Sequence, residues 1–174
     1  AAILMARCGY SDAAVLWLRW LADSCGNEGG SLSIGGVRGT LGSWGGADEA
    51  RRDPRAREIM QLDANLGIVA AIHELLVQSR GDGIVVLPEV PYRWPDFSFD
   101  GIRTAGAFLI GATVRDRQVE EVRVTSLVGG PLRLTVNLGP AWTADGRPMT
   151  GNRFETETAA GQTLVLRRAR CRPS

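Results

Sequence analysis

Three polar residues, Gln61, Asp63 and Asn65, stand where an apolar helix begins in the stretch "MQLDANLGIVAAIHELLVQS". A carboxylate near a helix N-terminus is held ionised by the free backbone N–H groups and the helix dipole. It then remains a hydrogen-bond acceptor at neutral pH, which is what orienting an amide or a water requires. A helix cap needs only one such residue. The pair Asp63 and Asn65 therefore indicates either a cap with a spare polar neighbour or the edge of a site.

The composition excludes several other chemistries. The 174 residues are 44% hydrophobic, carry a net charge of +1 and contain no lysine. Scattered arginines give no reason to expect nucleic acid or a membrane surface as a partner, and the absence of lysine excludes Schiff-base and P-loop chemistry. One histidine and three cysteines without a CxxC pair predict neither a metal site nor a cofactor. No apolar run reaches the roughly 18 residues of a membrane span. Cys8 and Cys25 are expected to pack as small hydrophobic residues.

The N-terminal part predicts helices that need neighbours. Residues 2–24 form two helical pieces broken at "CGYSD", and the second has an apolar stripe of Ala14, Leu18 and Leu21. There is no initiator Met or signal peptide, so we expect the chain to begin inside a helix with upstream sequence missing. Residues 26–58 are rich in glycine and lack a phosphate-binding motif. Trp44 in this segment could stack on a ligand or simply anchor the loop.

The second half of the chain predicts strands. A helix is expected over residues 65–79 and ends at "RGDG", where Gly81 and Gly83 stop it. Short segments such as "VEEVRVTSLV" and "PLRLTVNLG" then alternate apolar and polar residues, as half-buried antiparallel strands do. We therefore predict an α+β chain with helices in 1–82 and a β-rich, sandwich-like domain in 83–174.

Four segments in order resemble the C-terminal end of glycoside hydrolase family 95, which contains α-L-fucosidases and their relatives. They are "LMARCGYSDAAVLWLRWL", "MQLDANLGIVAAIHELLVQS", "GIVVLPEVPYRWP" and "GIRTAGAFLIGATVRD". Residues 67–79 and 87–108 align without gaps, and the resemblance covers roughly residues 1–25 and 60–115. It implies the last helices of an (α/α)6 barrel followed by a β-sandwich-like domain.

The resemblance also implies roles for the polar residues. Family members invert configuration, with a general acid Glu from elsewhere in the barrel and a base-side Asn that a neighbouring Asp polarises. Asp63 occupies the position of that Asp. Asn65 and Gln61 match residues of the same motif and would line the sugar site, with Trp44 as a further candidate for substrate binding. The implied substrate is an oligosaccharide or glycoconjugate, and a secreted or periplasmic setting is implied by the resemblance alone.

Some positions depart from the family pattern. Ala64 replaces a glycine that would allow backbone angles closed to alanine, and Leu66 replaces a phenylalanine. The upstream His-rich segment, the Asn-bearing motif and the general acid Glu are not found in this chain. We therefore expect the chain by itself to lack glycosidase activity and to depend on the missing N-terminal barrel sequence.

Three interpretations follow from the sequence. The first is the C-terminal part of an inverting glycoside hydrolase that contributes Asp63 to catalysis. The second is a non-catalytic module, left from such an enzyme, that binds carbohydrate or a partner. The third is an unrelated α+β domain in which Asp63 caps a helix.

Overall fold

The computed structural model describes residues 1–25, 62–81 and 83–169, in two compact units, Ala1–Ile72 and His73–Ser174. The domain limits expected from the sequence, 1–82 and 83–174, stay a prediction. The helices are α1 (Ala2–Arg7), α2 (Ser11–Cys25) and α4 (Leu62–Leu76). The strands are β1 (Val77–Arg80), β2 (Gly83–Val86), β3 (Phe97–Thr104), β4 (Phe108–Arg115), β5 (Gln118–Ser126), β6 (Gly130–Val136), β7 (Ala141–Ala144), β8 (Arg147–Thr150), β9 (Arg153–Thr158) and β10 (Thr163–Arg168).

Helices α1 and α2 of the first unit separate where the sequence predicts. Gly9, with φ +80°, adopts the left-handed conformation that ends a helix. On α2, Ala14 is fully buried and Leu18 is half-buried, which confirms the predicted apolar stripe. Trp20 is 40% exposed, and its ring stacks on the equally exposed Trp17 ring with centroids 4.7 Å apart. Cys8 is exposed, so its expected packing as a small hydrophobic residue was wrong.

Helix α4 ends three residues before the sequence predicts. It stops at Leu76, and residues 77–80 continue directly as β1, which pairs antiparallel with β2. The expectation that the helix runs to Ser79 was therefore wrong. Val77 is buried opposite Val86, so pairing with a later strand overrides the helical spacing of the local sequence. In "RGDG", Gly81 follows β1 and Gly83 begins β2, so these glycines lie at a hairpin connection instead of ending a helix.

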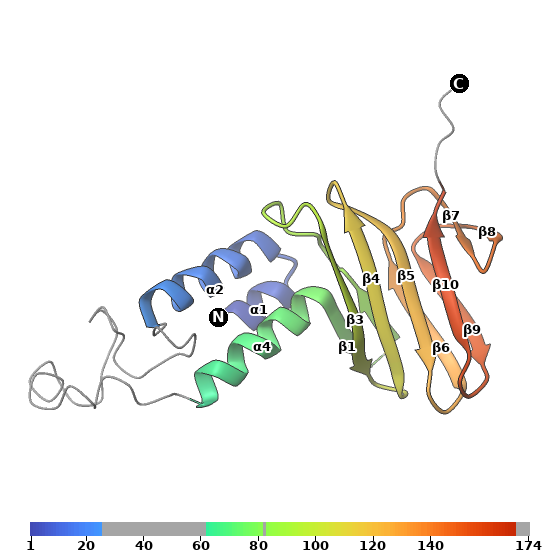
Figure 1. Cartoon of the computed structure of the whole chain (residues 1–174), viewed down its shortest axis with the longest axis horizontal. Helices are drawn as coiled ribbons and strands as arrows, with labels where there is room; N and C mark the ends of the chain where they lie inside the picture. Colours follow the sequence, from blue (N-terminus) through green and yellow to red (C-terminus); the bar gives the residue numbers. More distant parts are fainter. Residues whose placement is uncertain (26–61, 82, 170–174) are drawn as a thin grey trace, which may run out of the picture. The chain divides into compact units, whose positions relative to one another are not determined.

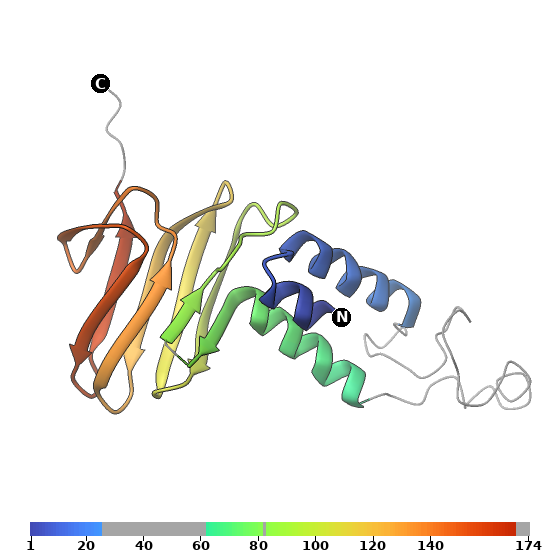
Figure 2. The same ribbon diagram turned by 180° about the vertical axis from the view of Figure 1, so that it is seen from behind.

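The second unit contains two sheets, which Figures 1 and 2 show as successive layers. The six-stranded sheet has the order β3-β4-β5-β10-β7-β8, and the four-stranded sheet has the order β1-β2-β6-β9. Within the described strands, β2 and β6 run parallel and all other neighbours run antiparallel. The parallel pair differs from the antiparallel arrangement that the sequence predicts. Strands β3, β4 and β5 lie between β2 and β6 in the sequence, and this long connection allows the two strands to run in the same direction.

The core of the second unit is formed by the apolar residues that alternate with polar ones along the predicted strands. Val122 and Val124 of β5 are fully buried, as are Leu132 and Leu134 of β6. The largest buried side chain is Trp142 of β7, which is 1% exposed. Its ring packs edge-on against the ring of Phe154 of β9, with the ring centroids 6.0 Å apart. An aromatic contact therefore joins the two sheets. Its Nε1 donates a hydrogen bond of 2.8 Å to the Gly151 carbonyl oxygen.

A buried hydroxyl also links the sheets. Thr158 Oγ1 of β9 donates to the carbonyl oxygen of Gly130 at 2.7 Å and lies 3.0 Å from Ser126 Oγ at the end of β5. Ser126 is 1% exposed, and its Oγ accepts a bond from the Gly129 N–H. Because these polar groups are removed from water, each depends on its protein partners.

We expect Thr158→Val to lower the free energy of unfolding by about 1–2 kcal/mol, since it keeps the shape and removes the buried hydroxyl. Urea unfolding followed by circular dichroism measures the change. The matched control is Thr163→Val, which removes an exposed hydroxyl 3.0 Å from that of Thr125 and should change stability by less than about 0.5 kcal/mol. Equal losses in the two variants would contradict the importance of the buried hydroxyl.

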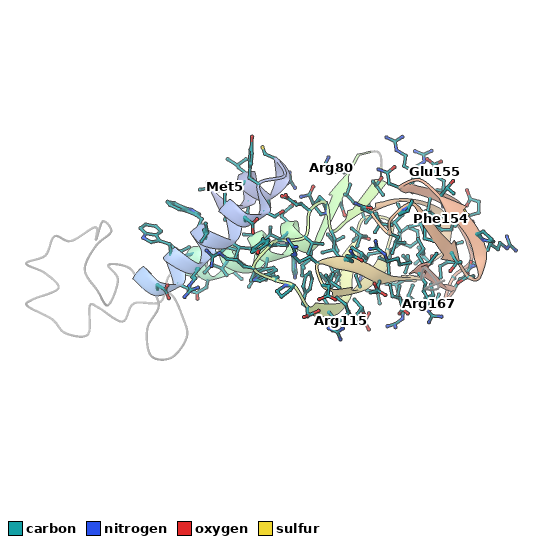
Figure 3. All side chains as sticks on the ribbon, turned by 90° about the horizontal axis from the view of Figure 1, so that it is seen from above. Met5, Arg80, Arg115, Phe154, Glu155 and Arg167 are labelled. Atoms are coloured by element: carbon teal, nitrogen blue, oxygen red, sulfur yellow. The ribbon has the colours of Figure 1, made fainter. Side chains whose placement is uncertain are left out.

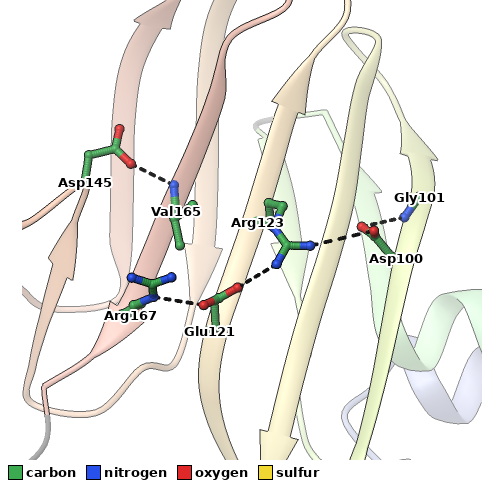
Figure 4. Close-up of polar contacts among 7 residues, drawn as sticks. All are labelled: Asp100, Gly101, Glu121, Arg123, Asp145, Val165 and Arg167. Carbon is green, nitrogen blue, oxygen red and sulfur yellow. Dashed lines mark hydrogen bonds and ion pairs between the residues drawn. The ribbon is translucent and has the colours of Figure 1, made fainter.

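The outward faces of the second unit carry charged side chains. Figure 3 shows Arg80 and Glu155 along one side of this unit and Arg115 and Arg167 along the opposite side. Along the six-stranded sheet, Glu121 accepts bonds of 2.9 Å from both Arg123 and Arg167 (Figure 4). Because these ion pairs are exposed to water, each contributes little to the free energy of folding. This face of the six-stranded sheet is hydrated.

Candidate active site

The candidate catalytic residue lies at the N-terminal end of α4. Asp63 is the second residue of this helix, whose first backbone N–H groups have no partner within the helix. The positive end of the helix dipole therefore favours a carboxylate at this position. The side chain of Asp63 lies outside the described part of the structure.

Asn65 lies inside the helix instead of before it. It is the fourth residue of α4 and is half-buried. A helix cap precedes the first helical residue, and α4 begins at Leu62, which argues against the alternative that Asp63 or Asn65 is the N-cap. Residues two apart on a helix do not face each other, so positions 63 and 65 lie on different faces of α4. A ligand bound against one face of α4 would therefore contact only one of these two positions directly.

The remaining predicted site residues are not placed. Gln61 and Trp44 lie outside the described residues, and their roles in substrate binding stay predictions. Around Asp63 the described part of α4 carries apolar side chains that are open to solvent: Leu66 is 60% exposed and Val69 is 51% exposed. Leu66 is also where the resemblance expects a phenylalanine, and its exposure leaves room there for a larger side chain.

Within residues 1–25, 62–81 and 83–169, no group of three or more His, Cys, Asp or Glu side chains could hold a metal ion. None of the helices described is long and apolar enough to cross a membrane.

One set of functional candidates was missed by the sequence analysis. A hollow on the four-stranded sheet of the second unit collects charged side chains from strands far apart in the sequence. Its arginines are far apart in the sequence, so only the order of the strands brings them together. The hollow is lined by Arg80, Gly83, Val85, Pro88, Arg133, Leu134, Thr135, Arg153 and Glu155.

Parts of the chain are similar to known glycoside hydrolase sequences. The sequence pattern described as glycoside hydrolase family 95, C-terminal domain, matches residues 78–166. The protein named alpha-L-fucosidase 2 of Arabidopsis thaliana is 39% identical over 61 residues, which make up 34% of this chain and 7% of that protein. The match therefore spans a small part of that relative's length.

A solved structure overlaps part of the chain. It is a GH127 β-L-arabinofuranosidase from Geobacillus stearothermophilus T6, with 15% sequence identity and a TM-score of 0.39. The overlap covers 59% of this chain and 18% of the other.

Proposed function

Because this chain belongs to glycoside hydrolase family 95, we propose that it is the C-terminal part of an inverting glycoside hydrolase acting on α-L-fucosides or related glycosides. The family membership of residues 78–166 carries the proposal, and the similarity to a named α-L-fucosidase supports the choice of sugar. The substrate would be an oligosaccharide or a glycoconjugate.

In this proposal the two units have different roles. The helices of the first unit are the last helices of an (α/α)6 barrel, and the second unit is a β-sandwich-like domain. Exposed apolar side chains on the helices support the first role, because such side chains are normally covered by neighbouring helices. Leu4 is 68% exposed and Leu16 is 47% exposed, and Trp17 and Trp20 are partly open as well. The missing N-terminal barrel sequence would supply the covering helices.

Asp63 has the catalytic role in this proposal. Inverting hydrolysis needs an acid that protonates the leaving oxygen and a base-side group that activates water on the opposite face of the sugar. A carboxylate ionised at the N-terminus of α4 would accept a hydrogen bond from a base-side Asn amide and orient its oxygen towards the water. The Asn and the general acid Glu would come from the barrel sequence outside this chain. Asn65, Gln61 and Trp44 would contact the sugar.

A non-catalytic binding module is the second candidate. It is favoured by Ala64 and Leu66, which replace residues of the family motif beside Asp63. In that case the chain would bind a glycan or a partner without cleaving it.

The stereochemistry of hydrolysis tests the proposal. The full-length protein containing this chain is incubated with aryl α-L-fucoside and with a panel of other aryl glycosides, and proton NMR follows the first sugar released. We expect turnover of the α-L-fucoside or of a related glycoside, with the β-anomer of fucose appearing first because the reaction inverts the anomeric centre. The 174-residue chain alone should give no turnover.

Three results would contradict parts of the proposal. First release of the α-anomer would contradict inversion. Turnover by the 174-residue chain alone would contradict its dependence on barrel residues. Binding of a glycan without turnover of any member of the panel would favour the non-catalytic module.

A further inference from the structure

The hollow on the four-stranded sheet has the volume of a small-ligand site. Its volume is about 500 Å³, within the range of ligand pockets in proteins. Gly83 lines the hollow without a side chain, and a Cβ at this position would lie 2.7 Å from the carbonyl oxygen of Arg133, so β2 and β6 approach each other closely there. All lining residues belong to the second unit. The site is therefore built by one unit alone.

Strand pairing gathers positive charge at this hollow. Arg133 of β6 lies opposite Glu155 of β9, and the next position on the same face pairs Thr135 with Arg153. Arg80 enters from β1, opposite Gly83. Three guanidinium groups thus meet one carboxylate among the described residues that line the hollow. The Arg133 and Glu155 side chains are separated by 4.0 Å and are mostly exposed, so that pair neutralises the cluster only in part.

Arg80 is held in place by a neutral partner. Its Nε and Nη2 donate to the side-chain oxygen of Gln78 at 3.1 and 2.6 Å. Gln78 is 2% exposed, and its own Nε2 donates to the Glu74 carbonyl oxygen at 2.9 Å. An amide acceptor fixes the orientation of the guanidinium without cancelling its charge. Arg80 therefore keeps a full positive charge and spare N–H donors at the rim of the hollow.

We infer that this hollow binds an anionic group of a glycan, either the carboxylate of a uronic acid or a sulfate ester. Oriented guanidinium groups recognise the paired oxygens of carboxylate and sulfate through charge-assisted hydrogen bonds. The lining contains no aromatic ring among the described residues, so recognition rests on charge and not on stacking against a sugar face. The choice of a glycan as the carrier rests on the proposed function. Binding would be weakened by salt, since the charged side chains are exposed.

Titration calorimetry of the full-length protein tests this inference with defined probes. Trigalacturonate and galactose 6-sulfate represent the two anionic groups, and the methyl ester of trigalacturonate and free galactose are their neutral counterparts. We expect at least one anionic probe to bind, its neutral counterpart not to bind, and the affinity to fall as sodium chloride is raised. The probe that binds identifies which of the two groups the hollow takes.

Variants locate the binding. Arg80→Gln and Arg153→Gln should each weaken binding by about tenfold or more, as expected for the loss of one charge-assisted contact. Gln78→Leu should weaken it as well, because Arg80 loses the partner that orients it. The control is Arg115→Gln, which removes an exposed arginine from the opposite side of the second unit and should leave binding unchanged (Figure 3).

Several outcomes would overturn the inference. They are binding of neither anionic probe, equal binding of the neutral counterparts, and equal loss in Arg115→Gln and the hollow variants. Equally tight binding of an acidic peptide with the same charge would also overturn it, since the site would then not be specific for glycans. The titration measures binding and does not depend on glycoside hydrolysis. A failed glycosidase assay would therefore contradict the proposed function, whereas a failed anion titration would contradict only the inferred anion site.

Discussion

Asp63→Ala is expected to lower kcat/KM for the α-L-fucoside by about 10²–10⁴-fold in the full-length enzyme, the range for loss of a group in general base catalysis. The base-side amide would lose the carboxylate that polarises it, so water would be activated poorly. The free energy of unfolding should fall by no more than about 1 kcal/mol, the size expected for the loss of a carboxylate that interacts with a helix dipole. Steady-state kinetics and urea unfolding of the same preparation give both quantities.

Asp12→Ala provides the matched control. Asp12 is the second residue of α2, as Asp63 is of α4, so both substitutions remove a carboxylate from the first turn of a helix. We expect Asp12→Ala to cost a similar amount of stability and to leave kcat/KM unchanged. If the two variants behave alike in both measurements, Asp63 has only a role in helix stability, and the catalytic proposal is wrong.

Trp142→Ala has the largest expected effect on stability, with a loss of about 3–5 kcal/mol in the free energy of unfolding. Trp142 is 1% exposed, contacts Phe154 from the other sheet and donates to the Gly151 carbonyl oxygen. Its removal would leave a cavity between the sheets and one unsatisfied carbonyl group. Urea unfolding followed by circular dichroism measures the loss.

Two further tryptophan variants separate the causes. Trp142→Phe keeps most of the ring volume but removes the Nε1 donor, so a loss of about 1–2 kcal/mol is expected. Trp20→Ala removes a ring that is 40% exposed and should cost less than Trp142→Ala. A loss for Trp142→Ala no greater than that for Trp20→Ala would mean that Trp142 is not central to the core of the second unit.

Local sequence predicted the elements whose apolar pattern is strong. The helices around "CGYSD", the alternating strands β5 and β6 and the change from helix to strand follow from side-chain spacing within each segment. The end of α4 was predicted wrongly, because the helix was expected to continue to the glycines of "RGDG", whereas the pairing of β1 with β2 decides the structure. Strands β7 and β8 have only four residues each, and β8 has no buried residue, so they carry little signal of their own. The parallel pairing of β2 with β6 depends on contacts between distant segments.

The candidate sites were predictable to different degrees. Asp63 was identified because its neighbours in sequence form a recognisable motif at the start of a helix. The hollow was missed because Arg80, Arg133 and Arg153 are far apart in the chain and become neighbours only through the strand order β1-β2-β6-β9. The buried amide of Gln78 could not be foreseen either, since it lies where the sequence predicts a continuing helix.

The parallel pairing of β2 and β6 has a consequence for how the protein is made. Strands β3, β4 and β5 lie between β2 and β6 in the sequence. One edge of β2 therefore has no partner until β6 has been synthesised and pairs with it. Pairing between segments so distant is slow, on the order of milliseconds to seconds in proteins dominated by such contacts. During that delay the free edge of "GIVV" can pair with another chain, and this edge is the point at which aggregation would compete with folding.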